Sequence, residues 1–166
     1  MKTYVLTVSR TFPKTHKRAG EETFFNERIL SALSKDLLMW NKIHTIRANY
    51  ELWAKRIKEI QEGKAILSIR YWSGKAYCSK QVEICQLDKN SGIGVQGLVF
   101  NAVRLCEGKE TPLYATIYEP LSYKFCPPLN DLAKNDGLSL EDFKDWFRKY
   151  DLSKSMAIIH FTKFRY

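Results

Sequence analysis

The order of strand and helix patterns along the chain limits its fold more than any other feature of the sequence. Residues 64–72 form the clearest strand, because apolar side chains alternate along it. Further strands are predicted over 4–8, 42–47, 79–87, 93–100, 113–118 and 156–164, and helices over 24–34, over 49–62 and from Ser139 onward. Strands and helices do not alternate regularly, which argues against a parallel Rossmann sheet. We therefore expect an α+β fold, a mixed or antiparallel β-barrel with about three to four peripheral helices.

Local signals support the predicted helix boundaries. Thr23 and Asn49 stand where N-terminal caps are needed, and Gly63 follows the second helix as a stop signal. Ser139 and Asp142 have the spacing of a capping box. The glycines of residues 92–97 match the pattern G-x-G-x-x-G, but a strand-like sequence follows them instead of a helix. They therefore predict turns or a bulge, not a dinucleotide site.

The charge of the chain is concentrated in its first half. There are 27 Lys and Arg residues against 18 Asp and Glu, a net charge of +9. Residues 1–80 contain 16 basic and 7 acidic residues, whereas residues 81–166 contain 11 of each. The basic half is also rich in aromatic residues, which predicts a folded surface and not a disordered tail. A folded basic surface is typical of proteins that bind a polyanion.

Composition excludes several classes of protein. The 166 residues are enough for one domain, which we place over 1–166, with no need for a metal or a disulfide. No run of apolar residues is long enough for a membrane span or a secretory signal, so we expect a cytoplasmic protein that does not contact membranes. The four cysteines are far apart and have no zinc-site spacing; free thiols are expected, and their even number leaves a disulfide open. We expect no metal and no cofactor.

The segment 42–47 contains a combination of residues with catalytic potential. A buried Lys42 with a lowered pKa could accept the hydroxyl proton of Thr45 and make it a nucleophile, if a nearby carboxylate oriented the lysine. As a plain strand, the segment would place Lys42 and Thr45 on opposite faces, unless side chains at the strand end swing into one cleft. The alternative is that Thr45 is an ordinary strand residue, and that Lys42 and Arg47 are solvated or bind phosphate. His44 is either a packing residue or a ligand contact.

A second group of residues is typical of single-stranded nucleic-acid binding. Arg70 and Trp72 share one face of the strand over 64–72, and Lys75, Tyr77 and Lys80 follow. Bases stack on aromatic rings while cations contact the phosphates. The alternative is that Trp72 packs beneath a helix and the cations lie on a solvated edge.

Several of these segments together resemble the ASCH domain family, a branch of the PUA-like superfamily. The resemblance covers most of residues 22–164, and the strand and basic loop over 1–21 precede this common core. It rests on the helix that contains Phe25, the segment 42–47, the helix 49–62, the strand and turn 69–75, the segment 136–143 and the closing strand 158–161.

The resemblance implies a small β-barrel with helices around a central cleft, and RNA as a partner. One bacterial branch of the family hydrolyses acetylcytidine to cytidine with a Thr, Lys and Glu set. On the matching positions, these residues fall on Thr45, Lys42 and Asp136, the last being a shorter carboxylate than Glu.

Two functional hypotheses follow, and a third is weaker. The first is an RNA- or nucleotide-binding protein of RNA metabolism or translation-related regulation. Its basic cleft would be formed by Lys42, His44, Arg47, Arg70, Trp72, Lys75, Tyr77 and Lys80. The second is an amidohydrolase that acts on a modified nucleoside through Lys42, Thr45 and Asp136. The third is a regulator whose basic face binds an acidic protein. A monomer or weak dimer is expected, and the sequence identifies no protein partner.

Overall fold

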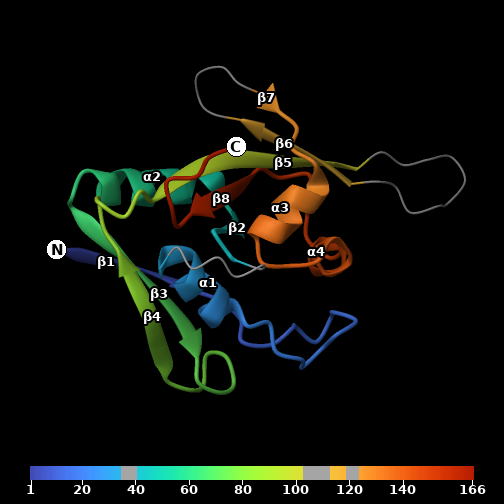
Figure 1. Ribbon diagram of the computed structural model, residues 1–166, viewed down its shortest axis with the longest axis horizontal. Helices are drawn as coiled ribbons and strands as arrows, with labels where there is room; N and C mark the ends of the chain where they lie inside the picture. Colours follow the sequence, from blue (N-terminus) through green and yellow to red (C-terminus); the bar gives the residue numbers. More distant parts are fainter. Residues whose placement is uncertain (35–40, 103–112, 119–123) are drawn as a thin grey trace, which may run out of the picture.

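The computed structural model describes residues 1–34, 41–102, 113–118 and 124–166, and shows an α+β fold with two separate sheets (Figure 1). The first sheet has the strand order β1-β3-β4, with β1 parallel to β3 and β4 antiparallel to it. The second has the order β2-β8-β5-β6-β7, and all its pairs are antiparallel. The mixed and antiparallel pairing predicted from the sequence is therefore confirmed.

The elements follow one another along the chain in the order expected from the apolar patterns. The strands are β1 (Lys2–Thr7), β2 (His44–Ala48), β3 (Ala65–Trp72), β4 (Gln81–Leu87), β5 (Gly94–Ala102), β6 (Leu113–Tyr118), β7 (Lys124–Phe125) and β8 (Met156–His160). The helices are α1 (Phe25–Ser34), α2 (Tyr50–Gln61), α3 (Leu129–Asn135) and α4 (Leu140–Phe147). The short helix α3 and the two-residue strand β7 have no counterpart among the predicted elements.

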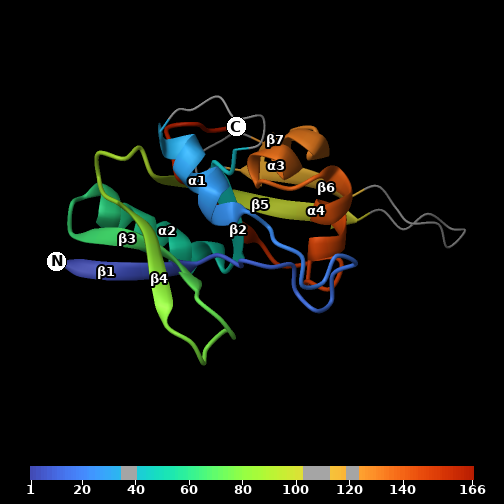
Figure 2. The ribbon, with the colours of Figure 1, turned by 60° about the horizontal axis from the view of Figure 1, so that its bottom comes forward.

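Both sheets contribute to one apolar core, and α2 packs against strands of each (Figure 2). The helix begins where its sequence predicts, because the side chain of Asn49 accepts a hydrogen bond from the backbone N–H of Leu52. Likewise, Ser139 accepts from the backbone N–H of Asp142 and opens α4. None of the described helices is long and apolar enough to cross a membrane.

The predicted closed barrel is not formed by the part of the chain that the structure describes. No backbone ladder joins β1 to β2 there, and the two sheets stay separate. Instead, the guanidinium group of Arg47 crosses from β2 and donates to the carbonyl oxygen of Thr7 at 2.7 Å. Thr7 and Arg47 also line the cavity that contains the candidate site.

The glycine-rich segment 92–97 serves the fold and precedes no helix. Gly92 has a φ of +77° in the turn before β5, a conformation that favours glycine. Gly97 lies within β5, where a Cβ atom would meet the ring of Tyr118 at 2.3 Å. The turn prediction is confirmed, and close packing explains the later glycine. Among the cysteines, Cys78, Cys85 and Cys126 are free thiols, and Cys106 lies outside the described residues.

Candidate active site

Lys42 is among the largest fully buried side chains of the described residues, although lysine is almost never fully buried in proteins. It lies just before β2 and forms an isolated bridge with Asp136, in the turn between α3 and α4. The neighbouring backbone is paired as well, because the N–H of Ile43 donates to the carbonyl oxygen of Asn135 at 3.0 Å. This backbone pairing brings two segments 94 residues apart into register and places the two charged side chains face to face.

The ammonium group of Lys42 is held by Asp136 at two points. Its Nζ atom lies 2.6 Å from Oδ1 and 2.6 Å from the backbone oxygen of Asp136. The same Nζ lies 4.2 Å from the centre of the Phe25 ring, within the range of a cation–π contact. The shorter carboxylate of Asp136 therefore reaches the lysine, because the bridge in the backbone compensates for the missing methylene.

Burial changes the protonation of this pair. Removal from water lowers the pKa of Lys42 from 10.5 to about 8, although the charge of Asp136 and the hydrogen bond to it act in the opposite direction. For Asp136, burial acts to raise the pKa, but the charge of Lys42 and the contacts with His44 outweigh it and hold the pKa below its ordinary value. A lysine with a pKa near 8 can act as a general base close to neutral pH.

Thr45 is also buried, on β2, and its hydroxyl group has a defined partner. Arg47 donates from Nη1 to Oγ1 of Thr45 at 2.9 Å, and also holds the carbonyl oxygen of Ile46 at 2.8 Å. Since Oγ1 accepts from Arg47, the hydroxyl proton is free for another acceptor. A guanidinium group beside the oxygen would also stabilise the alkoxide that forms when this proton leaves.

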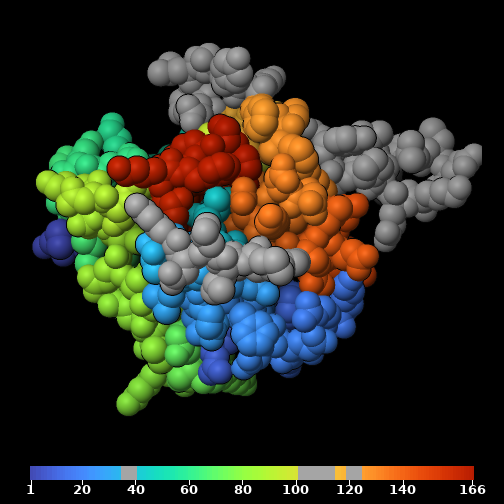
Figure 3. All heavy atoms as spheres, viewed as in Figure 1, coloured from blue at the N-terminus to red at the C-terminus, as the bar shows by residue number. Residues whose placement is uncertain are grey.

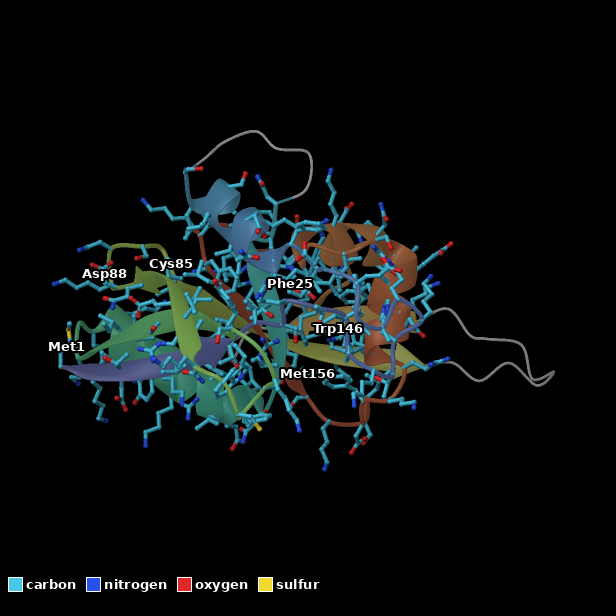
Figure 4. All side chains as sticks on the ribbon, turned by 90° about the horizontal axis from the view of Figure 1, so that it is seen from below. Met1, Phe25, Cys85, Asp88, Trp146 and Met156 are labelled. Atoms are coloured by element: carbon cyan, nitrogen blue, oxygen red, sulfur yellow. The ribbon has the colours of Figure 1, made fainter. Side chains whose placement is uncertain are left out.

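Lys42, Thr45, Arg47 and Asp136 line one cavity of about 160 Å³. Half of its other lining residues are aromatic, namely Phe25, Trp146, Phe147 and Tyr150, and the rest are Thr7, Val8, Ser9 and Ile46. Figure 4 shows Phe25 and Trp146 near the centre of the molecule, with ring centres 5.7 Å apart. Drug-sized ligands occupy pockets of roughly 300–1,000 Å³. The cavity is therefore suited to a small planar group beside a cation and a carboxylate.

The strand alternation expected for 42–47 does not separate Lys42 from Thr45. The regular strand β2 begins only at His44, so the backbone at Lys42 is free to direct its side chain toward Asp136. In Figure 3, the cyan-green atoms of this part of the chain show only as a small area between blue, orange and red neighbours. Lys42 and Thr45 therefore do not point to opposite faces of a strand, and both side chains line one cavity.

Gly137 allows the turn after Asp136 to approach Lys42. Its φ is +76°, and a Cβ atom at this position would lie 3.1 Å from Cβ of Lys42. Arg28 of α1 donates a hydrogen bond to the carbonyl oxygen of Gly137 and fixes the turn from the other side. The sequence pair Asp136-Gly137 thus combines the carboxylate with the residue type that adopts this φ most readily and that places no Cβ atom against Lys42.

His44 lies beside the carboxylate of Asp136 and does not line the cavity. Its side chain is buried, with Nδ1 3.7 Å from Oδ1 of Asp136 and Nε2 2.8 Å from the hydroxyl group of Tyr166. The structure thus places His44 behind the Lys42–Asp136 pair, away from any ligand in the cavity.

The remaining predicted binding residues form a separate group on the hairpin of β3 and β4. Arg70, Trp72, Lys75, Tyr77 and Lys80 are absent from the cavity lining. Arg70 faces Glu83 at 3.6 Å, and the rings of Trp72 and Tyr77 lie 5.4 Å apart. The ring of Tyr77 is 89% exposed. The single basic cleft expected from the sequence is therefore two groups of residues: a buried site at Lys42 and an exposed aromatic and basic hairpin.

The aromatic cavity wall and Tyr166 were not predicted as site residues. Trp146 and Phe147 belong to the apolar face of α4, and a helical apolar pattern does not distinguish a cavity wall from ordinary core. Tyr166 has no sequence signal that connects it to His44. No group of three or more His, Cys, Asp or Glu side chains that could hold a metal ion occurs within the described ranges.

Comparisons with protein-family models, with curated proteins and with solved structures found no match to this chain. The ASCH resemblance therefore stays a prediction.

Proposed function

We propose that the protein is an amidohydrolase that removes an acyl group from the base of a modified nucleoside or nucleotide, with N4-acetylcytidine as the first substrate to test. The observation behind the proposal is the fully buried Lys42–Asp136 ion pair in the same cavity as Thr45. Burying a lysine is costly, and a structural contact alone does not require it. Strongly perturbed groups in a cavity are typical of catalytic sites.

The proposed reaction has two halves. Thr45 Oγ1 attacks the amide carbonyl carbon while its proton passes to neutral Lys42, and Arg47 stabilises the developing negative charge on oxygen. When the C–N bond breaks, the proton on Lys42 passes to the departing amino group of the base, and the acyl group stays on Thr45 as an ester. Water then hydrolyses this ester, with Lys42 again as the base, and releases acetate. Asp136 orients Lys42 throughout.

The substrate class rests on two different supports. The aromatic walls of the cavity, together with its small volume, suit a flat base with a short acyl group. The nucleoside itself comes from the resemblance to the ASCH family, whose PUA-like arrangement is part of this proposal. A cytoplasmic setting is also part of it, and free thiols at Cys78, Cys85 and Cys126 fit a reducing compartment.

Trapping of the acyl-enzyme tests this proposal directly. Incubation with N4-acetylcytidine should release cytidine and acetate, and rapid acid quenching followed by mass spectrometry should find an acetyl group on Thr45. The variant Thr45→Val keeps the shape of the side chain but lacks the hydroxyl group, and should lose both turnover and the adduct. Thr3→Val, at an exposed position of β1, is the matched control and should retain both. Turnover by Thr45→Val at the wild-type rate would contradict the assignment.

A second candidate function is the binding of single-stranded RNA by the β3–β4 hairpin. The half-buried ring of Trp72 lies beside the exposed ring of Tyr77 there, and Lys75 and Lys80 are close in the chain. This hairpin belongs to the half of the chain that has the entire positive excess. Stacking of bases on these rings would hold an RNA strand independently of the cavity.

We expect Trp72→Ala to weaken binding of a short single-stranded RNA by about 1–3 kcal/mol, because one stacked base is lost. Affinity of the unaltered protein should also fall steeply with salt concentration, as phosphate contacts require. Fluorescence anisotropy with labelled RNA measures both. Phe125→Ala removes an exposed ring on β7, outside the hairpin, and should leave the affinity unchanged. Binding that does not depend on salt, or equal losses in both variants, would rule out this surface.

A further inference from the structure

Asp136 has a second buried neighbour, which belongs to a chain of polar side chains that the proposed reaction does not use. Asn135 Nδ2 donates to the hydroxyl group of Tyr166 at 2.9 Å. That hydroxyl lies 2.8 Å from Nε2 of His44, whose Nδ1 lies 3.7 Å from Oδ1 of Asp136. The same Oδ1 accepts from Lys42. Hydrogen bonds therefore lead from Asn135 through Tyr166 to His44, and the last step, from Nδ1 of His44 to Asp136, is an electrostatic contact that is too long for a hydrogen bond.

Tyr166 is held firmly at the outer end of this path. Its backbone N–H donates to Oε1 of Gln96 at 3.0 Å, and its carbonyl oxygen accepts from Nε2 of the same side chain at 3.3 Å. Gln96 is itself buried in β5. The rings of His44 and His160, which are register partners on β2 and β8, lie 5.7 and 5.9 Å from the Tyr166 ring. In this arrangement the hydroxyl group of Tyr166 lies between His44 and Asn135.

The hydrogen-bond partners of Tyr166 indicate where the proton of His44 lies. Tyr166 already accepts from Asn135, so its single hydroxyl proton is available to His44 Nε2. A neutral His44 then has its own proton on Nδ1, the nitrogen that faces Asp136. We infer that Tyr166 and His44 are positioning residues of this site: Tyr166 fixes the Nδ1–H tautomer of His44, which orients and stabilises the Asp136 carboxylate beside Lys42. The inference rests on the site of the proposed function.

His44 is held neutral by burial and by the charge of Lys42, which together outweigh the opposite effect of Asp136. It faces Asp136, Lys42, Tyr166 and His160. Burial lowers the pKa of His44, and burial also lowers that of His160 to about 2, so both imidazoles are uncharged near neutral pH. Burial raises the pKa of Tyr166, which keeps its hydroxyl proton in place.

The same arrangement affects the base. The positive charges of Arg28 and Arg47 also act to lower the pKa of Lys42. An N–H group directed at Asp136 offsets part of the negative charge of the carboxylate, and so weakens the attraction between the carboxylate and the ammonium group of Lys42. Loss of this donor should therefore raise the pKa of Lys42 and leave less of the neutral base at a given pH.

Nitrogen-15 NMR of histidine-labelled protein tests the tautomer without any substrate. The chemical shifts of His44 should identify the Nδ1–H form in the unaltered protein, and observation of the Nε2–H form would overturn the inference. Tyr166→Phe removes the donor to Nε2 and should reduce the Nδ1–H population. Tyr4→Phe is the matched control, because that hydroxyl also bonds a side chain, Glu59, at 2.6 Å. It should leave His44 unchanged.

The second measurement follows the Lys42 side chain by NMR as the pH is raised. Tyr166→Phe should move its midpoint upward by about half a pH unit or more, and Tyr4→Phe should not. An unchanged or lower midpoint in Tyr166→Phe would overturn the inference, provided that its urea unfolding shows a folded protein. Neither measurement involves turnover. A protein that lacks hydrolase activity can therefore still show this arrangement of Tyr166 and His44, and an active protein can lack it.

Discussion

Asp136→Ala should lower the free energy of unfolding by about 3–5 kcal/mol, the usual cost of removing one partner from a buried ion pair. The variant leaves the ammonium group of Lys42 buried, with its Nζ no longer facing the carboxylate that lay 2.6 Å away. Urea unfolding at neutral pH measures the loss. The double variant Asp136→Ala with Lys42→Met should recover much of it, because an apolar side chain of similar length then fills the site.

A matched pair of charges at the surface provides the control. Lys64 and Glu62 also lie 2.6 Å apart, but both are well exposed, and Glu62→Ala should change the stability little. Comparable losses in Asp136→Ala and Glu62→Ala, with no recovery in the double variant, would show that water reaches the Lys42 pair and that its burial is not as described.

The pH dependence of this stability follows from the lowered pKa of Lys42. The folded pKa is about 8 and the ordinary value is 10.5, so between these values the unfolded chain binds more protons than the folded one. The contribution of Lys42 to stability should therefore rise with pH across this window and be constant below it. Without Asp136, the pKa of Lys42 falls further. The difference in free energy of unfolding between the unaltered protein and Asp136→Ala should therefore become smaller as the pH rises toward 8.

The sequence predicted the elements well wherever a local signal was strong. The caps at Asn49 and Ser139 and the alternation over 64–72 correspond to α2, α4 and β3. Closure of a barrel is different, because it depends on which strands meet across long separations. Nothing local in β1 or β2 shows that a side chain of Arg47, and not a backbone ladder, connects them.

The candidate site was predicted in part for the same reason. Lys42, Thr45 and Asp136 were selected from residue types and a resemblance, and they do line one cavity. The hairpin residues from Arg70 to Lys80 were grouped with them by charge, although charge along a chain does not show which way a hairpin points. The burial of Lys42 could not be predicted from the sequence, because it depends on the turn at Asp136-Gly137 and on the rings of Phe25 and Trp146.

If Lys42 is the base, the rate of hydrolysis should follow its neutral form. With a pKa of about 8, kcat/KM for N4-acetylcytidine should rise about tenfold per pH unit below that value and level off above it. Lys42→Met should lower kcat by about 10²–10⁴-fold and remove the rise, because general-base catalysis is lost. Lys2→Met, at an exposed position, should preserve both the rate and the profile.

The pH profile of the unaltered enzyme decides this assignment even where Lys42→Met folds poorly. Lys42 has a pKa of about 8, whereas the lowered pKa of Asp136 lies far below that value and the guanidinium group of Arg47 stays charged. A rate that is flat from pH 6 to 9, or a midpoint that survives in a folded Lys42→Met, would assign the base elsewhere. A midpoint near pH 8 in the unaltered enzyme that is absent from Lys42→Met would identify Lys42 as the base. The burial of Lys42 by the turn at Asp136-Gly137 would then be directly connected to catalysis.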